Sequence, residues 1–105
     1  MKKLTLFATL ALLSACDRNR SGAEDVVRTA LKDPDSARFG EFYYNDKTEK
    51  GCLTVNAKNS MGGYTGDQQA YVQHTKDGWE SIGSADIPAS MCRETHADTV
   101  PEKKD

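Results

Sequence analysis

The sequence has few apolar residues and no excess of positive charge. Hydrophobic residues make up 37% of the 105 positions, and many of them lie within the first fifteen residues. Fourteen lysines and arginines stand against sixteen acidic residues, which gives a net charge of -2. Nucleic-acid binding would need a basic face, which this balance does not favour. A chain of this length and composition suits one small domain with a thin core.

The sequence also lacks the common motifs of catalysis and cofactor binding. It has no C-x-x-C pair, no C-x-x-C-H haem signature and no Gly-Lys-Ser/Thr step of a P-loop. It shows no serine elbow and no paired catalytic carboxylates. We therefore expect a protein that is not an enzyme and that needs no cofactor.

The one long apolar run lies at the start of the chain. Lys2 and Lys3 precede a mostly apolar stretch over residues 4–13, and small residues lead from there to Cys16. A basic start, a short apolar run and small residues at its end are typical of an export signal. The run is shorter than the ~20 residues that a permanent transmembrane helix needs.

Residues 13–16, Leu-Ser-Ala-Cys, resemble the lipobox of bacterial lipoproteins. The resemblance implies that residues 1–15 are a signal peptide, removed by signal peptidase II. It also implies that Cys16 carries a thioether-linked diacylglycerol and an amide-linked acyl chain, such as palmitate. Two or three acyl chains hold a protein firmly on a bilayer, whereas one chain does not. The alternative is an ordinary secretory signal with a cysteine at this place by chance.

The residues after Cys16 bear on the location. Asp17 resembles the signal that keeps lipoproteins of enterobacteria in the inner membrane, so the inner membrane is favoured over the outer, with the domain on the periplasmic side. Residues 16–20 are predicted to form a short lipidated tether. In it, Arg18 and Arg20 either approach anionic headgroups or are simply solvated.

A helix and a helical corner are predicted to follow. Ser21 and Glu24 have the spacing of a capping box, and Asp33 precedes Pro34, where the helix should stop. Residues 33–39 then suit a short helical corner that ends in a core phenylalanine. One face of the helix is apolar, with the spacing of Ala23, Val26, Val27, Ala30 and Leu31.

Three strands are predicted next, at residues 41–45, 52–58 and 69–75, with Trp79 and Ile82 covering the core. The predicted fold is therefore of the α+β class. One N-terminal amphipathic helix and the helical corner would pack on a three-stranded antiparallel meander. The domain is expected to span residues 21–92, and the polar residues 93–105 to form a disordered tail.

Two segments resemble a family of small bacterial proteins of unknown function. They are the DPDSARF corner and CLTVNAKNSMGGYTG, which match a DP-SA-F corner, a cysteine that opens the next strand, and a VNAKN-x-x-GGY-x-G pattern. The resemblance covers residues 33–66, about a third of the chain. It implies a fold, and it carries over no activity.

Cys52 and Cys92 are the cysteines that remain beside Cys16. In an oxidising periplasm such a pair usually forms a disulfide, and two free buried thiols are the alternative. A zinc site that adds His74 and His96 is the less favoured interpretation, because the spacing lacks any C-x-x-C pair. We expect no metal.

The segment NAKNSMGGYTG is the candidate contact surface. Its glycine amides can form an anion nest, while the alternative is a loop whose glycines only permit positive φ angles. The aromatic residues of the chain could line a ligand face, but in so small a domain most should belong to the core. The residues predicted for the contact surface are Asn56, Lys58, Asn59, Gly62, Gly63 and Tyr64.

Together these patterns favour a small lipid-anchored lipoprotein that faces the periplasm. It is expected to act as a non-catalytic module that binds another envelope protein, of the exclusion, immunity or secretion-accessory type. Its partners would be the lipid bilayer, through acylated Cys16, and one envelope protein, without nucleic acid. The alternatives are a structural envelope protein that binds peptidoglycan and a zinc-dependent enzyme.

Overall fold

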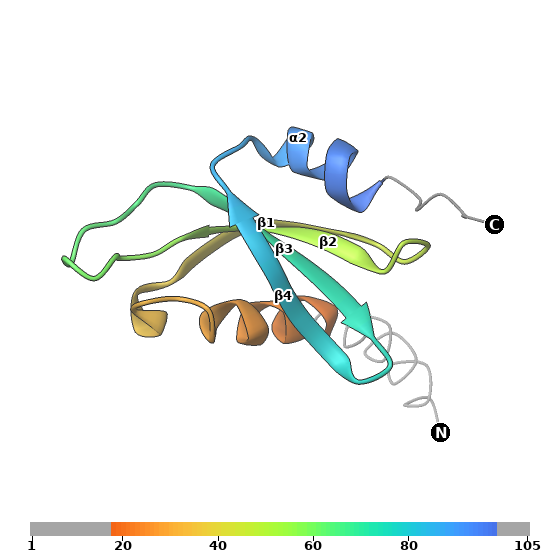
Figure 1. Cartoon of the computed structure of the whole chain (residues 1–105), viewed down its shortest axis with the longest axis horizontal. Coiled ribbons are helices and arrows are strands. Elements are labelled where there is room, and N and C mark those ends of the chain that lie inside the picture. The colour runs from red at the N-terminus through yellow and green to blue at the C-terminus, as the bar shows by residue number, and fades with distance from the viewer. Residues whose placement is uncertain (1–17, 99–105) are drawn as a thin grey trace, which may run out of the picture.

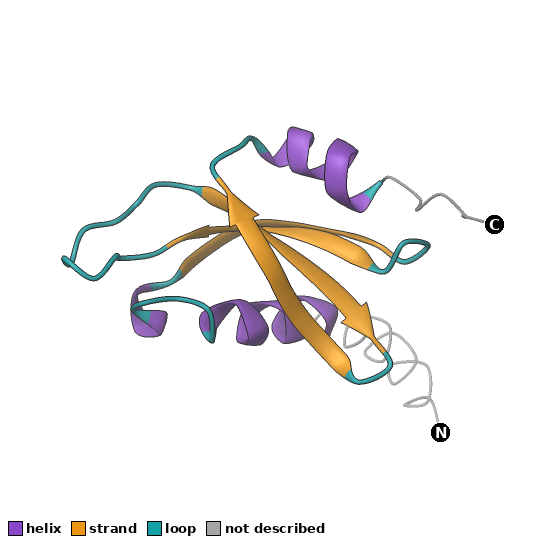
Figure 2. Ribbon diagram, in the orientation of Figure 1, coloured by secondary structure: helices purple, strands orange, loops and turns teal. Residues whose placement is uncertain are grey.

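A four-stranded antiparallel sheet forms the middle of the protein, with helices on both of its faces (Figures 1 and 2). The computed structural model describes residues 18–98. The strands follow one another in the order β1-β2-β3-β4, each hydrogen-bonded to the next. They are β1 (Arg38–Asn45), β2 (Lys50–Asn56), β3 (Gln68–Thr75) and β4 (Gly78–Ala85). The α+β class is thereby confirmed.

The fourth strand corrects the predicted three-stranded meander. β4 pairs with β3 across a two-residue turn, with Thr75 opposite Gly78 and His74 opposite Trp79. Its sequence, GWESIGSA, lacks the alternation of apolar and polar residues that would have predicted a strand, and most of its side chains are exposed or half-buried. Its place in the sheet therefore depends on backbone pairing with β3. Trp79 packs against the core as expected, whereas Ile82 is 43% exposed and does not cover it.

The N-terminal helix also differs from its prediction in its limits. The described residues 18–28 are helical, so residues 18–20, expected in the tether, belong to the helix instead. Arg20 explains the difference, because its Nε lies 2.8 Å from Glu24 Oε2 and its Nη2 donates to the carbonyl of Gly40 at 2.7 Å. These contacts hold the first turn on the sheet, and Ser21 is an exposed residue within the helix rather than its cap.

The predicted apolar face of this helix packs on one face of the sheet. Ala23 and Val27 are buried against residues of the two central strands, β2 and β3. The helix comes close to the sheet at Gly22, where a β-carbon would lie 2.4 Å from Cδ1 of Trp79. The buried residues of this cluster are Ala23, Val27, Leu53, Val55, Ala70 and Val72.

The opposite face of the sheet is covered by the C-terminal segment, α2 (Ala89–Cys92) and the helical turn η2 (Arg93–Ala97). Cys92 forms a disulfide with Cys52 of β2, which confirms the predicted pair. Both cysteines and Ala97 are buried, with Tyr43, Tyr71 and Ile87 packed around them.

The predicted boundary between domain and tail at residue 93 is corrected by this packing. Ala97 is fully buried, and its carbonyl accepts a hydrogen bond from Thr48 Oγ1 at 2.6 Å. Tyr43 donates its hydroxyl to Asp98 Oδ1, also at 2.6 Å. Local sequence could not indicate that residues 93–98 fold onto the sheet, because the residues that stabilise them lie about fifty positions away in the sequence. The remainder of the predicted tail, residues 99–105, lies outside the described residues, as do the predicted signal peptide and Cys16.

The disulfide should contribute much of the stability. Replacing both cysteines with alanine should lower the free energy of unfolding by about 3–4 kcal/mol, because the closed loop spans 40 residues of sequence. Urea unfolding followed by far-UV circular dichroism measures the change. Ser90→Ala, at an exposed neighbouring position in α2, is the control. An unchanged urea midpoint in the double alanine variant would contradict the expectation.

Candidate functional site

The loop between β2 and β3, residues 57–67, carries most of the predicted contact surface. Asn59 organises its tip, since its Oδ1 accepts hydrogen bonds from the backbone amides of Met61 at 2.9 Å and Gly63 at 3.2 Å. The amide of Gly62 donates to the carbonyl of Asn59 at 3.0 Å, and Gly62 has a φ of +85°. An anion nest needs these three amides free, and here they are all occupied. The glycines serve the turn itself.

The same loop is tied to the helical corner η1 (Pro34–Ser36). The amide of Lys58 donates to Ser36 Oγ at 2.8 Å, and the hydroxyl of Tyr64 donates to the Ser36 carbonyl at 3.0 Å. Arg38 adds a cation–π contact, its guanidinium carbon 4.2 Å from the centre of the Tyr64 ring. The two predicted motifs, the corner and the glycine-rich loop, therefore form one structural unit.

The corner is present but shorter than the predicted residues 33–39, since its helical turn covers residues 34–36 and β1 begins at Arg38. Its capping differs as well. Pro34 stands at its start, but the side chain of Asp33 makes no capping hydrogen bond. Ser36 stabilises the corner instead, because both its amide and its hydroxyl donate to the carbonyl of Asp33, at 3.1 and 2.8 Å. Ser36 thus stabilises the corner and holds the loop, a double role that its sequence position did not indicate.

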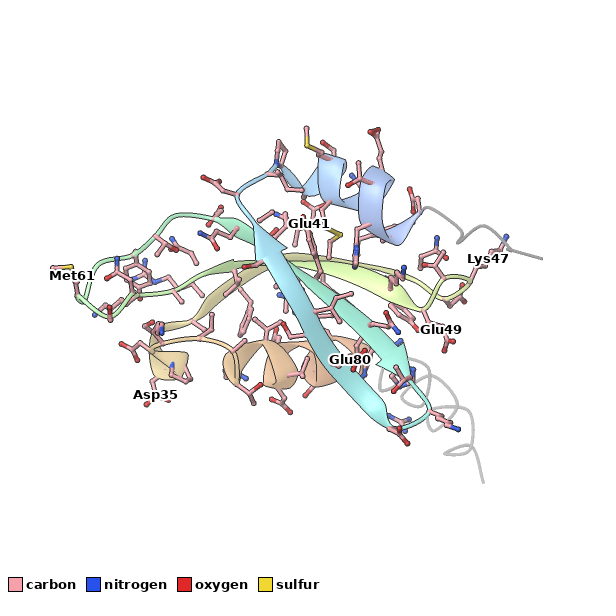
Figure 3. The ribbon with its side chains drawn as sticks, viewed as in Figure 1. Asp35, Glu41, Lys47, Glu49, Met61 and Glu80 are labelled. Carbon is pink, nitrogen blue, oxygen red and sulfur yellow. A yellow bond between two sulfur atoms is a disulfide. The ribbon has the colours of Figure 1, made fainter. Side chains whose placement is uncertain are left out.

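The six predicted contact residues gather at one end of the sheet, but they differ in what they present to solvent. Asn56 uses its Oδ1 to accept from the amide of Gly66 at 3.0 Å, so it closes the base of the loop. Tyr64 is 37% exposed, and Met61, which the prediction left out, is 92% exposed at the far tip (Figure 3). The exposed apolar groups of the loop are therefore Met61 and part of the Tyr64 ring.

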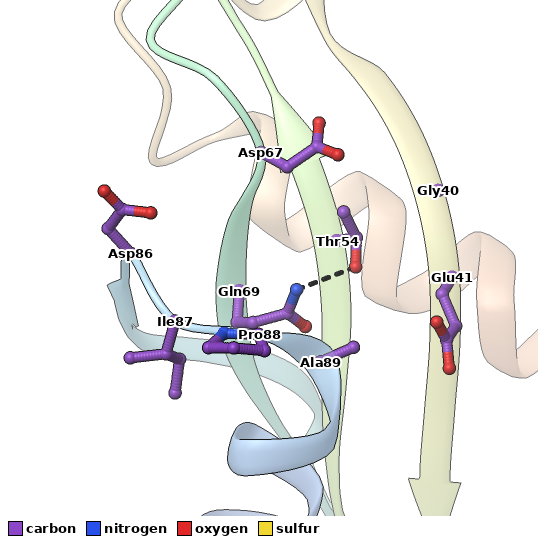
Figure 4. Close-up of a pocket in the computed structure, with 9 residues that line it drawn as sticks. All are labelled: Gly40, Glu41, Thr54, Asp67, Gln69, Asp86, Ile87, Pro88 and Ala89. Atoms are coloured by element: carbon purple, nitrogen blue, oxygen red, sulfur yellow. Dashed lines mark hydrogen bonds between the residues drawn. The ribbon is translucent and has the colours of Figure 1, made fainter.

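A second feature lies at the same end of the sheet, on the face that α2 covers. It is an open pocket of about 520 Å³ between β1, β2, β3 and the segment that leads into α2 (Figure 4). Three acidic residues, Glu41, Asp67 and Asp86, are among its lining residues, and Figure 4 shows their carboxylates on different sides of it. The full lining is Gly40, Glu41, Thr54, Asp67, Gln69, Asp86, Ile87, Pro88 and Ala89. Sequence analysis missed this pocket, because its acidic residues are far apart in the chain and follow no motif.

His96 occupies a separate position on the α2 face, stacked on Tyr71 with ring centres 4.5 Å apart. Its Nε2 is buried and has no hydrogen-bond partner among the described residues. Burial, together with the nearby charge of Lys50, lowers the pKa of His96, against an opposing backbone hydrogen bond with Val72. A neutral imidazole is therefore part of the packing on this face.

The remaining aromatic residues are mainly structural. Phe42 and Trp79 pack on the helix side of the sheet, and Tyr43 and Tyr71 pack beside the disulfide. Trp79 also meets the ring of Tyr44 edge to face, with centres 5.2 Å apart. Tyr64 is the aromatic residue of the loop at residues 57–67, and part of its ring is exposed there.

The structure also bears on the alternative zinc site. Cys52 and Cys92 are bonded to each other and cannot act as thiolate ligands, so the ligand set of this alternative is wrong. His74 packs against Trp79, on the helix side of the sheet, whereas His96 stacks on Tyr71 on the other side. Over residues 18–98, no group of three or more histidine, cysteine or acidic side chains is arranged to hold a metal ion.

Comparisons with protein-family models, curated proteins and solved structures found no match to the chain. The resemblance of residues 33–66 to a family of small bacterial proteins stays a prediction. Within the described residues, no helix has both the length and the hydrophobicity that crossing a membrane requires.

The burial of His96 predicts that acid weakens the fold. In the unfolded chain a histidine has its ordinary pKa near 6.5, so a pH decrease through that value protonates the unfolded state first. The free energy of unfolding should be at its full value above pH 6.5 and should fall as the pH approaches the lower pKa of the folded state. Urea unfolding at several pH values between 7.5 and 5 measures this change.

His96→Gln should flatten the pH dependence of the unfolding free energy, because the group that titrates is gone. His74→Gln, in the β3–β4 hairpin, is the matched control and should keep the decrease that His96 causes. An equally steep pH dependence in the His96 variant would show that another group is responsible.

Proposed function

We propose that this protein is a lipid-anchored lipoprotein on the periplasmic side of a bacterial inner membrane, where it binds another envelope protein without catalysis. The observation that carries the proposal is the loop at residues 57–67. Asn59 and Ser36 hold it in one conformation, while Met61 and Tyr64 remain exposed on it. Such a module would suit a role in exclusion, in immunity or as an accessory to secretion.

A braced loop favours binding for an energetic reason. A flexible loop loses conformational entropy when a partner orders it, and a loop held by internal hydrogen bonds loses less. Tyrosine, methionine and arginine are also enriched at protein interfaces. Tyr64, Met61 and the Arg38 side chain stacked on Tyr64 supply all three at one end of the sheet.

The proposed anchor agrees with the position of the N-terminal helix. Residue 18 is already helical and lies two positions after Cys16 in the sequence, so a lipid on Cys16 would lie close to the helix. The domain would then be held close to the membrane surface instead of at the end of a long tether. The disulfide supports the same compartment, because structural disulfides persist in the oxidising periplasm.

The anchor can be tested at Cys16. Mass spectrometry of the protein from bacterial membranes should find an amino-terminal peptide that begins at Cys16 and carries acyl chains. Cys16→Ser should remain unprocessed and unacylated, because the thioether needs the thiol. The control is Ser21→Ala, which leaves the lipobox intact and should be processed normally. An intact, unacylated amino-terminal peptide in the parent protein would contradict the lipoprotein assignment.

The binding surface can be tested by cross-linking the full-length protein in its native membrane. One envelope protein should dominate the cross-linked products, and Tyr64→Ala or Asn59→Ala should reduce its recovery about tenfold, as for residues central to an interface. Ile82→Ala removes an exposed apolar side chain from β4, away from the loop, and should keep the partner. All variants are checked for the Cys52–Cys92 disulfide and for native circular dichroism.

If no protein is recovered above background from the parent strain, the binding function fails. It also fails if the loop variants and Ile82→Ala lose the partner to the same degree, because the loss would then not be specific to the loop.

A further inference from the structure

The acidic pocket beside α2 contains charges that the fold leaves without partners. In the part of the chain that the structure describes, neither Asp67 nor Asp86 has a side-chain hydrogen bond or an ion pair. Glu41 has only a long contact, 4.0 Å from its Oε2 to Nη1 of Arg93. No basic residue is among the lining residues. The lining residues therefore carry a net negative charge, which would attract a cation.

The base of the pocket is a buried amide with one unused acceptor. Gln69 is only 3% exposed, and its Nε2 donates to Thr54 Oγ1 at 2.8 Å. Its Oε1 is buried and has no hydrogen-bond partner within residues 18–98. Figure 4 shows this oxygen turned toward the side of the pocket where Glu41 and Ala89 lie. An unpaired buried carbonyl is costly, and a ligand with N–H donors would satisfy it.

The remaining wall of the pocket is apolar. Ile87, Pro88 and Ala89 line it, and Ile87 also packs on the disulfide cluster beneath. A ligand that suits the whole pocket thus has an apolar part beside a cationic group with several donors. An arginine side chain has both, since its stem packs on apolar surface and its planar guanidinium carries five N–H donors. A lysine ammonium is a compact point charge with three donors, and matches separate acceptors less well.

We propose that this pocket binds the guanidinium of an arginine side chain from a partner polypeptide. Gln69 Oε1 accepts from it at the base, and the negative charges of Asp67, Asp86 and Glu41 attract it from the rim. Asp67 ends the loop of residues 57–67 and also lines the pocket, so one partner can contact both features. The polypeptide origin of the arginine rests on the proposed binding function, whereas the guanidinium site does not.

The test uses the full chain, purified in a non-ionic detergent and labelled with nitrogen-15. The probe is Nα-acetyl-arginine N-methylamide, which presents the side chain as a polypeptide does. Titration should give saturable NMR shifts of the Gln69 side-chain amide and of the backbone amides of Asp67 and Asp86. Raising the salt concentration should weaken binding, because it screens these partly exposed charges.

Two variants assign the binding to this pocket. Asp67→Asn combined with Asp86→Asn removes two charges at nearly constant volume, and should weaken binding about tenfold or more. Gln69→Met removes the buried acceptor and should also weaken it. Glu80→Gln changes an exposed acidic residue of β4 outside the pocket and is the control for net charge, with affinity unchanged (Figure 3).

Several results would overturn the proposal. The first is the absence of saturable shifts at ~10 mM probe, which would mean that any binding is weaker than millimolar. The second is equal binding of the lysine analogue or of Mg²⁺. The third is tighter binding of free arginine than of the blocked probe. Probe binding without a cross-linked envelope partner would leave the guanidinium site standing while the proposed binding function fails. A cross-linked partner without probe binding would support the proposed binding function and overturn the guanidinium site.

Discussion

The covalent bond between Cys52 and Cys92 holds the second layer of this protein in place. Among residues 18–98, the buried apolar residues on the α2 face of the sheet are Cys52, Cys92 and Ala97, which is too little apolar surface to keep a short helical segment packed unaided. The bond fixes α2 to the centre of β2, and the segment before α2 then forms the apolar wall of the acidic pocket. Both the tertiary order of the C-terminal segment and the shape of the pocket thus depend on one crosslink.

The other end of the pocket depends on a different set of contacts. Ser36 and Asn59 hold the corner and the loop together through hydrogen bonds to backbone groups, so this unit keeps its conformation with little hydrophobic core of its own. The loop returns the chain to the sheet at Asp67. An exposed apolar tip and an acidic pocket consequently lie at the same end of the sheet, a suitable arrangement for a partner that is apolar at one point and basic at another.

The features that could be predicted are those with a local signal. The apolar positions 23, 26 and 27 indicated the helix, whereas positions 30 and 31 of the same predicted face lie beyond its last helical residue, 28. The alternation in residues 52–58 indicated a half-buried strand with Cys52 on the side opposite Leu53 and Val55. Asp33-Pro34 indicated the corner. Local sequence did not indicate the helical conformation of residues 18–20, because the contact of Arg20 with Gly40, twenty residues away, stabilises it.

The sequence by itself determined the α+β class, the helix face, three of the four strands, the corner and the loop, because short-range periodicity, strand-forming composition and turn-forming residues encode each of them. Tertiary structure alone decided that β4 joins the sheet, that residues 93–98 pack on the sheet, and where the pocket forms. β4 has no apolar alternation and depends on pairing with β3, and Ala97 is buried by contacts with distant residues. Glu41, Asp67 and Asp86 are far apart in the sequence, and only the tertiary fold places all three around one pocket.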